Sequence, residues 1–99
     1  MKKILVAEDN DSNFILMSYI LKKGYTFDRA KNGQEAVDMA ATGDYDLVLM
    51  DIKMPIMDGI EATIKIRETN KELPIVALTA NAFDSDRTTA LEAGCNDST

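Results

Sequence analysis

The sequence predicts an α/β domain in which helices cover both faces of a parallel β-sheet. Three observations support this prediction. Apolar runs of strand length alternate with segments of helical periodicity along the 99 residues, which is the pattern of successive βα units. Because crossovers between parallel strands are right-handed, such units place helices on both sides of a sheet. Hydrophobic residues form 45% of the chain, which is enough to build a core.

Four strand–helix units can be placed in chain order. The predicted strands span residues 3–7, 26–30, 47–50 and 75–78. The predicted caps are Asp11 or Ser12 for the first helix, Asn32 for the second and Asp84 or Ser85 for the fourth, and the third helix carries Ile60, Ile64 and Ile66. The four helices are predicted to end at Gly24, at Gly43, near Asn70 and at Gly94. No linker or repeat separates the units, so we expect one domain over residues 1–99.

The individual patterns indicate where each element lies. Residues 3–7 and 47–50 are apolar without alternation, as strands covered on both faces are. Residues 26–30 alternate polar and apolar side chains, as a strand near a sheet edge does. Asn32 and Glu35 have the spacing of a capping box at a helix start.

Composition excludes several classes of function. The formal net charge of −6 argues against nucleic acid as a partner, because nucleic-acid phosphates attract Lys and Arg. It fits acids gathered around a cation, although ordinary solubilising charge explains it as well. Cys95 is the single cysteine, which favours a reducing, cytoplasmic location and carries no function of its own. No apolar run approaches the ~20 residues of a membrane span, so we expect no membrane insertion.

Carboxylates follow two of the predicted strands. Glu8 and Asp9 come after the first strand, Asp51 follows the third, and the hydroxyl of Thr79 follows the fourth. In parallel α/β sheets, ligands bind beyond the carboxyl ends of the strands, so we expect these groups at one edge of the sheet. Crowded carboxylates repel one another unless a cation lies between them. Oxygen ligands without His point to a hard ion, Mg²⁺ first.

This arrangement suits phosphoryl transfer, in which a carboxylate can be the nucleophile and form an aspartyl phosphate. Cations and hydrogen-bond donors stabilise the phosphoryl charge. Taken singly, each residue has a simpler explanation: Glu8 or Asp9 can cap the next helix, Thr79 can simply end a strand, and Asp58 with Gly59 can form a turn. Convergence at three strand ends favours the functional interpretation.

The sequence resembles the receiver domains of two-component response regulators and hybrid histidine kinases. The resemblance covers essentially the whole chain, and four segments carry it in family order and spacing: residues 4–10 (Ile-Leu-Val-Ala-Glu-Asp-Asn), residues 47–59 (Leu-Val-Leu-Met-Asp-Ile-Lys-Met-Pro-Ile-Met-Asp-Gly), residues 74–80 (Pro-Ile-Val-Ala-Leu-Thr-Ala) and residues 91–97 (Leu-Glu-Ala-Gly-Cys-Asn-Asp). The residues at 81–83 (Asn-Ala-Phe) and 94–97 (Gly-Cys-Asn-Asp) are more similar to those of hybrid-kinase receivers than to those of DNA-binding regulators.

The resemblance implies a role for each matching site residue. Asp51 would be the phosphoacceptor. Asp9 would bind Mg²⁺ directly, Glu8 would bind it through water, and the backbone carbonyl of Lys53 would be a further ligand. Thr79 would donate a hydrogen bond to the phosphoryl group. The side chains of Lys53 and Asn81 stand where the family tunes the lifetime of the phosphoryl group.

The resemblance also implies a flavodoxin-like fold. The receiver strand order is 2-1-3-4-5. The family continues beyond Asn96-Asp97 with an aromatic-bearing fifth strand, a Lys-Pro pair and a fifth helix, for which this sequence has no counterpart. We therefore expect the order 2-1-3-4 with the fifth βα unit missing, and no strand after Gly94. The fourth strand would then be an open apolar edge.

Three functions compete. The first is a phosphorelay receiver, phosphorylated on Asp51 by a histidine kinase or a histidine phosphotransfer protein. The second is a shortened receiver that acts as a non-switching interaction or dimerisation module. The open fourth strand predicts a homodimer or swapped oligomer in either case. The third, an aspartate-nucleophile phosphatase, is disfavoured because Lys53 stands where that class needs a second acid. We therefore expect no enzyme beyond self-catalysed phosphoryl transfer to Asp51 and its hydrolysis.

Overall fold

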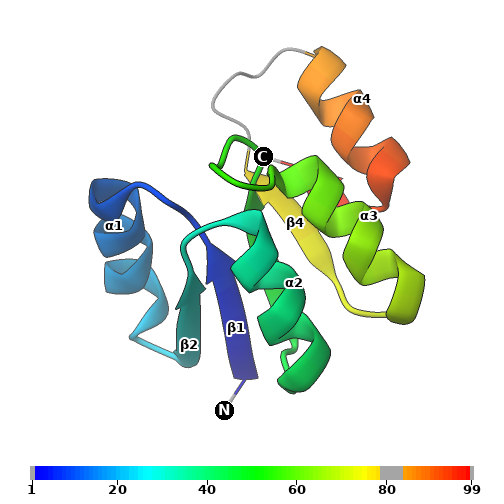
Figure 1. Ribbon diagram of the computed structural model, residues 1–99. Coiled ribbons are helices and arrows are strands. Elements are labelled where there is room, and N and C mark those ends of the chain that lie inside the picture. Colours follow the sequence, from blue (N-terminus) through cyan, green and yellow to red (C-terminus); the bar gives the residue numbers. More distant parts are fainter. Residues whose placement is uncertain (1, 79–83, 99) are drawn as a thin grey trace.

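The computed structural model describes residues 2–78 and 84–98 and shows a parallel sheet flanked by helices (Figure 1). The strands are β1 (Lys2–Ala7), β2 (Tyr25–Ala30), β3 (Leu47–Asp51), β4 (Ile75–Leu78) and β5 (Asp97–Ser98). The helices are α1 (Asp11–Leu21), α2 (Gly33–Thr42), α3 (Gly59–Thr69) and α4 (Asp84–Ala93). The sheet order is β2-β1-β3-β4-β5 with parallel pairing, which confirms the flavodoxin-like order 2-1-3-4 for the first four strands.

The two faces of the sheet are covered unequally. Helices α2, α3 and α4 lie on one side, where the larger core includes Leu5, Met50 and Ile75 (Figure 1). Helix α1 covers the other face, where a smaller cluster is built around Ile4 and Val6. The unalternated apolar strands β1 and β3 are central because they need cover on both faces.

Three helices begin at side-chain caps. Asn10 accepts a hydrogen bond from the Asn13 amide at 3.0 Å and caps α1, so the predicted cap at Asp11 or Ser12 was one or two residues late. Asn32 caps α2 by accepting from the Glu35 amide at 2.8 Å, as the capping box predicted. Asp58 caps α3 in the same way, so it is more than the turn residue that its sequence context suggested.

The prediction that no strand follows Gly94 is wrong. Asp97 and Ser98 pair in parallel with β4, opposite Val76 and Ala77. Just before them, the Asn96 amide donates to the Ile75 carbonyl at 2.7 Å, and the Ile75 amide donates to the Asn96 side-chain oxygen at 2.9 Å. Backbone pairing along β4 builds this short strand, and a search for apolar character could not find it because its residues are polar.

Arg67 of α3 fixes the turn that leads into β5. Its guanidinium donates to the carbonyls of Gly94 at 2.9 Å and Leu73 at 2.6 Å, and to the side-chain oxygen of Asn96 at 2.8 Å. One side chain therefore ties the end of α4 to the entry of β4. Within the described residues, no helix is long and apolar enough to cross a membrane.

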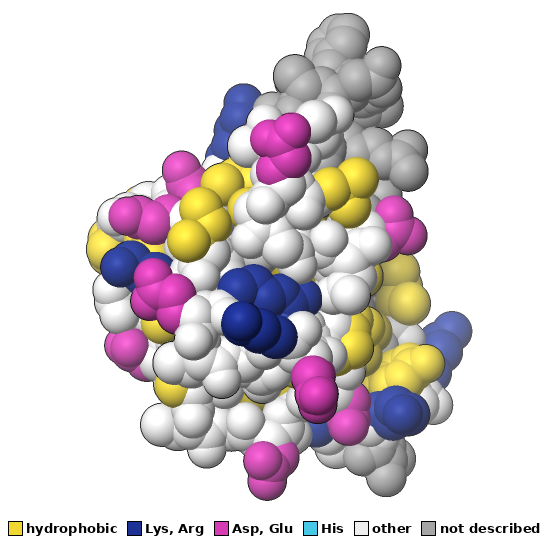
Figure 2. All heavy atoms as spheres, turned by 90° about the vertical axis from the view of Figure 1, so that its right-hand side faces the viewer, with side chains coloured by type: hydrophobic (Ala, Val, Ile, Leu, Met, Phe, Trp, Pro, Cys, Tyr) yellow, Lys and Arg dark blue, Asp and Glu magenta, His cyan; other side chains and the backbone are white. Residues whose placement is uncertain are grey.

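The side of the molecule that carries α4 and this sheet edge has mixed chemistry (Figure 2). Basic side chains lie near the middle of the visible face, acidic ones surround them, and apolar ones are scattered between. The prediction of a fully open apolar edge at β4 is wrong, because β5 pairs with part of that edge.

Candidate metal centre at the carboxyl edge of the sheet

Three carboxylates meet where β1 and β3 end. Ala7 lies opposite Met50 in the parallel pairing of the two strands, so the residues that follow them emerge side by side. One carboxylate oxygen from each of Glu8, Asp9 and Asp51 lies within 4.8 Å of the others. Glu8 is buried, Asp51 is half-buried and Asp9 is exposed. The structure thus brings together the three acids that the sequence placed at this edge.

The surroundings of Asp51 disfavour the negative charge of its carboxylate. The pKa of Asp51 is raised to about 7, first by burial and then by the charge of Glu8 and a hydrogen bond with it. The charge of Asp9 adds to this effect, while the Lys53 amide, which donates to Asp51 Oδ1 at 3.3 Å, opposes it. A cation between the carboxylates would remove this repulsion. Three oxygen donors of this kind fit a hard divalent ion such as Mg²⁺.

Glu8 and Asp9 lie on the β1–α1 turn, which side chains and backbone hold together. The Glu8 amide donates to the Ala30 carbonyl of β2 at 3.0 Å. The Glu8 carboxylate accepts from the Asn10 amide at 3.1 Å, and Asn10 in turn caps α1. The buried Glu8 side chain is therefore oriented by its own turn before any ligand binds.

The β3–α3 loop, residues 52–58, is held by two glycines instead. The Gly59 amide donates to the Ile52 carbonyl at 2.7 Å, and a Cβ on Gly59 would run into the Asp51 carbonyl. At the other side, the Gly33 amide donates to the Met57 carbonyl at 2.9 Å, and a Cβ on Gly33 would run into that same carbonyl. Only residues without a side chain allow these approaches. Neither glycine was predicted from the sequence to have this role.

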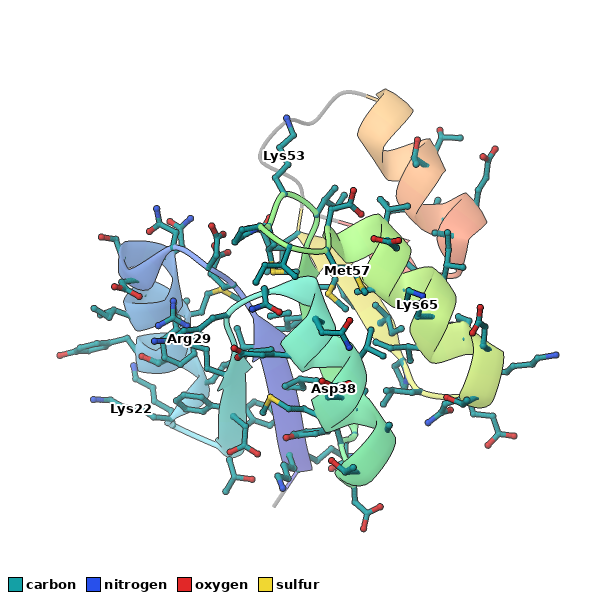
Figure 3. The ribbon with its side chains drawn as sticks, in the orientation of Figure 1. Lys22, Arg29, Asp38, Lys53, Met57 and Lys65 are labelled. Carbon is teal, nitrogen blue, oxygen red and sulfur yellow. The ribbon has the colours of Figure 1, made fainter. Side chains whose placement is uncertain are left out.

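The tip of this loop is strained. Ile56 has a φ of 69°, in the left-handed region that β-branched residues avoid, and its side chain is 81% exposed. The Met57 amide donates to the Pro55 carbonyl at 2.7 Å, so Ile56 is the central residue of a three-residue turn. Met57 itself is buried and points into the core (Figure 3). The buried Met57 and the two glycine contacts hold the strained conformation in place.

The remaining predicted site residues are placed only in part. The Lys53 side chain extends away from the sheet above its carboxyl edge (Figure 3). Its amide contacts Asp51, but no contact tests the predicted role of its carbonyl. Thr79 and Asn81 lie outside the described residues, directly after β4 ends at Leu78.

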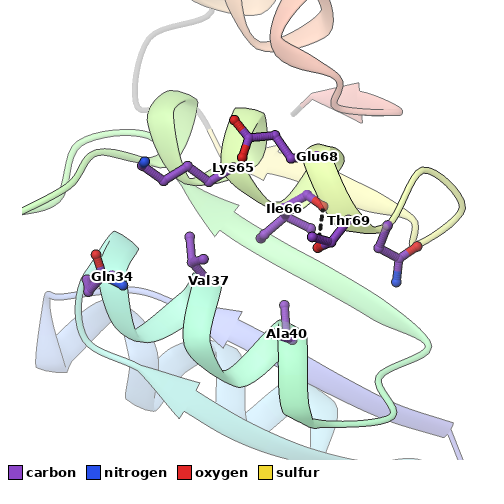
Figure 4. A pocket seen from close by; sticks show the side chains of 9 residues that line it. Gln34, Val37, Ala40, Lys65, Ile66, Glu68 and Thr69 are labelled. Atoms are coloured by element: carbon purple, nitrogen blue, oxygen red, sulfur yellow. Dashed lines mark hydrogen bonds between the residues drawn. The ribbon is translucent and has the colours of Figure 1, made fainter.

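Two hollows lie elsewhere on the surface. One, of about 340 Å³, lies between α2 and α3, with Val37 and Ala40 of α2 facing Ile66 and Thr69 of α3 (Figure 4). The other, of about 430 Å³, is mainly apolar and lies on the α1 side of the sheet. It is lined by Lys2, Ile4, Leu21, Tyr25, Asp46, Leu47, Leu49 and Pro74. Neither hollow includes the carboxylate cluster.

Comparison with known proteins gives consistent matches. Residues 4–98 match the family described as the response regulator receiver domain. Hybrid signal transduction histidine kinase B of Dictyostelium discoideum is 48% identical over 111 residues, and the match covers 98% of this chain but 6% of that protein. The chain therefore spans a small part of the length of this relative.

Solved structures agree with the sequence matches. The receiver domain of sensor histidine kinase PA1611 from Pseudomonas aeruginosa PAO1, with a magnesium ion coordinated in its active site cleft, is 40% identical with a TM-score of 0.92, and the match covers 99% of this chain and 83% of that one. A chain from the co-crystal structure of the Saccharomyces cerevisiae histidine phosphotransfer signaling protein Ypd1 and the receiver domain of its downstream response regulator Ssk1 is 36% identical with a TM-score of 0.93, covering 98% and 76%.

Proposed function

Because this chain belongs to the response regulator receiver domain family, we propose that it accepts a phosphoryl group on Asp51 in a Mg²⁺-dependent step of a two-component phosphorelay. Receiver domains are signalling modules and not classical enzymes. The observation that carries the proposal is the meeting of Glu8, Asp9 and Asp51 within 4.8 Å at the carboxyl edge of the sheet. Such a cluster is costly without a cation, and a Mg²⁺ site beside a nucleophilic carboxylate is what phosphoryl transfer to Asp requires.

Each residue has a defined part in this proposal. A carboxylate oxygen of Asp51 attacks the phosphorus of a phosphohistidine, the P–N bond breaks, and the imidazole leaves. Asp9, Asp51 and the Lys53 carbonyl would hold Mg²⁺ directly, and Glu8 would hold it through water. Mg²⁺, when bound, supplies positive charge to the phosphoryl oxygens. Thr79 donates a hydrogen bond to the transferred group.

The phosphodonor in this proposal is a histidine kinase or a histidine phosphotransfer protein in the cytoplasm. The co-crystal structure of Ypd1 with a receiver domain supports the second kind of donor. The surface next to the site supports a protein donor as well. Helix α1 starts two residues after Asp9, and four of its large apolar side chains are 60% or more exposed: Ile15, Leu16, Tyr19 and Ile20. Apolar patches of this kind mark protein contacts.

Self-association of this chain is part of the same proposal. The apolar hollow on the α1 side of the sheet, with Ile4, Leu47 and Leu49 in its lining, supports a contact with a second copy. The edge of β4 beyond the two-residue β5 offers backbone groups for strand pairing. Sedimentation equilibrium at micromolar concentration tests this part, and a strictly monomeric, folded protein would contradict it.

The acceptor is tested with acetyl phosphate and Mg²⁺, followed by intact mass spectrometry. We expect one phosphoryl group on the parent protein and none on Asp51→Asn. Asp44→Asn is the matched control, because Asp44 is an exposed acid in the loop before β3, at the opposite end of the sheet. Labelling that persists in Asp51→Asn would refute the assignment of the acceptor.

The metal assignment is tested separately by calorimetric titration with Mg²⁺. Asp9→Asn removes a charged oxygen ligand, so we expect its Mg²⁺ affinity to fall about tenfold or more, an ~1.4 kcal/mol change. The Asp44→Asn protein serves again as the control and keeps the parent affinity. Unchanged Mg²⁺ affinity in Asp9→Asn contradicts the proposed site.

A further inference from the structure

Arg29 on β2 reaches across to the turn that carries Glu8 and Asp9. Its Nε donates to the backbone carbonyl of Glu8 at 3.0 Å. Its Nη2 lies 2.8 Å from the Asp11 carboxylate. The guanidinium carbon lies 4.6 Å from the ring centre of Phe14, over its face. Figure 3 shows the side chain between β2 and α1.

This arginine is more buried than a surface ion pair requires. Its side chain is 17% exposed, whereas that of Asp11 is 81% exposed. The Nη2 atom is buried and has no aligned hydrogen bond among the described residues, although it is close to Asp11. A solvated ion pair would contribute little, so the burial of the guanidinium points to its contacts with Glu8 and Phe14.

The Glu8 carbonyl belongs to a peptide group that lies between two other hydrogen bonds of the turn. On one side of it, the Glu8 amide is fixed to the Ala30 carbonyl at 3.0 Å. On the other side, the Asn10 amide donates to the Glu8 carboxylate at 3.1 Å. Arg29 fixes the peptide group between these two bonds, and this peptide leads directly to Asp9. A shift of this peptide would move both carboxylates relative to Asp51.

Arg29 also pairs with an acid at the start of α1. Asp11 is the first residue of this helix and stands two residues after Asp9 in the sequence. The positive guanidinium lies 2.8 Å from the Asp11 carboxylate and so offsets the charge of that acid. Its planar form lets it bind a carbonyl, face a carboxylate and stack on a ring at once, which a lysine cannot do.

We propose that Arg29 is a positioning residue for the metal centre: by holding the Glu8 carbonyl and the start of α1, it sets Glu8 and Asp9 at the distance from Asp51 that a divalent ion needs. This inference rests on the proposed function, since it assigns Arg29 to the same Mg²⁺ site. It adds a residue of β2 to a carboxylate cluster that is otherwise built from residues at the ends of β1 and β3.

The test compares Arg29→Met, Arg29→Lys and Lys71→Met with the parent at 20 °C, after circular dichroism shows that each is folded. Methionine keeps an apolar stem without charge or donors. Lys71 is an exposed cation before β4, at the other end of the sheet, so its variant changes the net charge equally. Calorimetric titration with Mg²⁺ alone is the first readout.

We expect Arg29→Met to bind Mg²⁺ at least fivefold more weakly than the parent, Arg29→Lys to recover part of the loss, and Lys71→Met to stay within twofold. A merely structural arginine would lower the melting temperature of Arg29→Met but leave the Mg²⁺ affinity of the folded protein unchanged, and that result overturns the proposal. If Arg29→Met does not fold, Arg29→Lys is compared alone, with at least a twofold loss expected.

The second readout is amide hydrogen exchange without metal. The Asn10 and Asn13 amides both donate within the β1–α1 turn and its cap. We expect them to exchange at least fivefold faster in Arg29→Met, while the Glu35 amide in the α2 cap stays unchanged. A parent that binds no Mg²⁺ contradicts the proposed function alone, and the exchange rates then decide the role of Arg29: equal rates at Asn10 and Asn13 overturn it.

Discussion

The two loops beside the carboxylate cluster are held by different means. The β1–α1 turn is held by polar side chains, because Glu8, Asn10 and Arg29 all donate or accept hydrogen bonds within it. The β3–α3 loop depends in addition on close backbone approaches, because Gly33 and Gly59 have no side chains to keep the starts of α2 and α3 away from its backbone. Hydrogen bonds in the β1–α1 turn can be removed one at a time. The close approaches at Gly33 and Gly59 are lost when a single Cβ atom is added, because the backbone there is already packed.

The largest expected effect is therefore on the β3–α3 side. Gly59→Ala would place a Cβ in contact with the Asp51 carbonyl and 2.9 Å from the Ile52 Cα, and neither backbone atom can move aside cheaply. We expect the free energy of unfolding to fall by about 3 kcal/mol or more. Chemical denaturation monitored by circular dichroism measures it.

Gly24→Ala is the matched control for this substitution, since a Cβ on Gly24 meets nothing within 4 Å. We expect its free energy of unfolding to stay within about 1 kcal/mol of the parent. Equal effects of the two alanines would show that close packing at Gly59 does not hold the loop.

The second effect concerns the charge that both loops bring together. The folded-state pKa of Asp51 is raised to about 7 from its ordinary value of 3.8. The folded protein therefore binds a proton more tightly than the unfolded chain, so the contribution of Asp51 to stability is full below pH 4 and is lost as the pH rises to about 7. We expect Asp51→Asn to be the more stable protein at pH 8 without Mg²⁺, by about 1–2 kcal/mol after allowance for solvent screening.

Denaturation of the parent and of Asp51→Asn at several pH values between 4 and 8 measures this difference. Added Mg²⁺ should reduce it, because bound cation stabilises the parent cluster. A difference that does not change with pH would show that Asp51 does not titrate in this range.

A third, smaller effect is expected on the β1–α1 side. Asn10→Ala removes the side chain that accepts from the Asn13 amide at 3.0 Å and leaves α1 without its cap. We expect a loss of about 1 kcal/mol in the free energy of unfolding. Asn13→Ala serves as the control, because only the backbone of this exposed residue takes part in the cap. Thermal unfolding of both variants measures the effect. An Asn10→Ala protein as stable as the parent would show that the cap does not stabilise this turn.

The smallest effect is, like that of Asp51→Asn, a gain in stability. Ile56→Gly relieves the left-handed conformation at φ 69° and removes a side chain that is 81% exposed, so little packing is lost. Relief of strain and the added freedom of the unfolded chain oppose each other. We expect a net gain of about 0.5–1 kcal/mol in denaturant unfolding. Ile56→Val is the control, because valine is also β-branched and keeps the strain, so we expect no gain in stability. An equal gain in Ile56→Val would show that the gain comes from a smaller exposed apolar side chain and not from relief of the left-handed φ.

Different parts of the fold were predictable to different degrees. The unalternated strands and the capping box were local patterns, and β1, β3 and the start of α2 confirm them. The cap at Asn10 was missed because several neighbouring residues, Asn10, Asp11 and Ser12, can all act as caps and the choice depends on how the turn is held. The strand β5 was missed because its residues carry no apolar signal, and the exposed backbone of β4 decides its pairing.

The sequence by itself determined which acids meet: Glu8, Asp9 and Asp51 directly follow or end apolar strands, and parallel strands deliver their carboxyl ends to one edge. Only the tertiary structure decided how the cluster is held. Arg29 is distant from Glu8 in sequence, and Gly33 is distant from Met57, so their contacts exist only after β2 pairs with β1 and α2 packs beside the β3–α3 loop. The pattern of one strand reports its own burial, whereas a hydrogen bond or a close approach between loops depends on the relative positions of two elements.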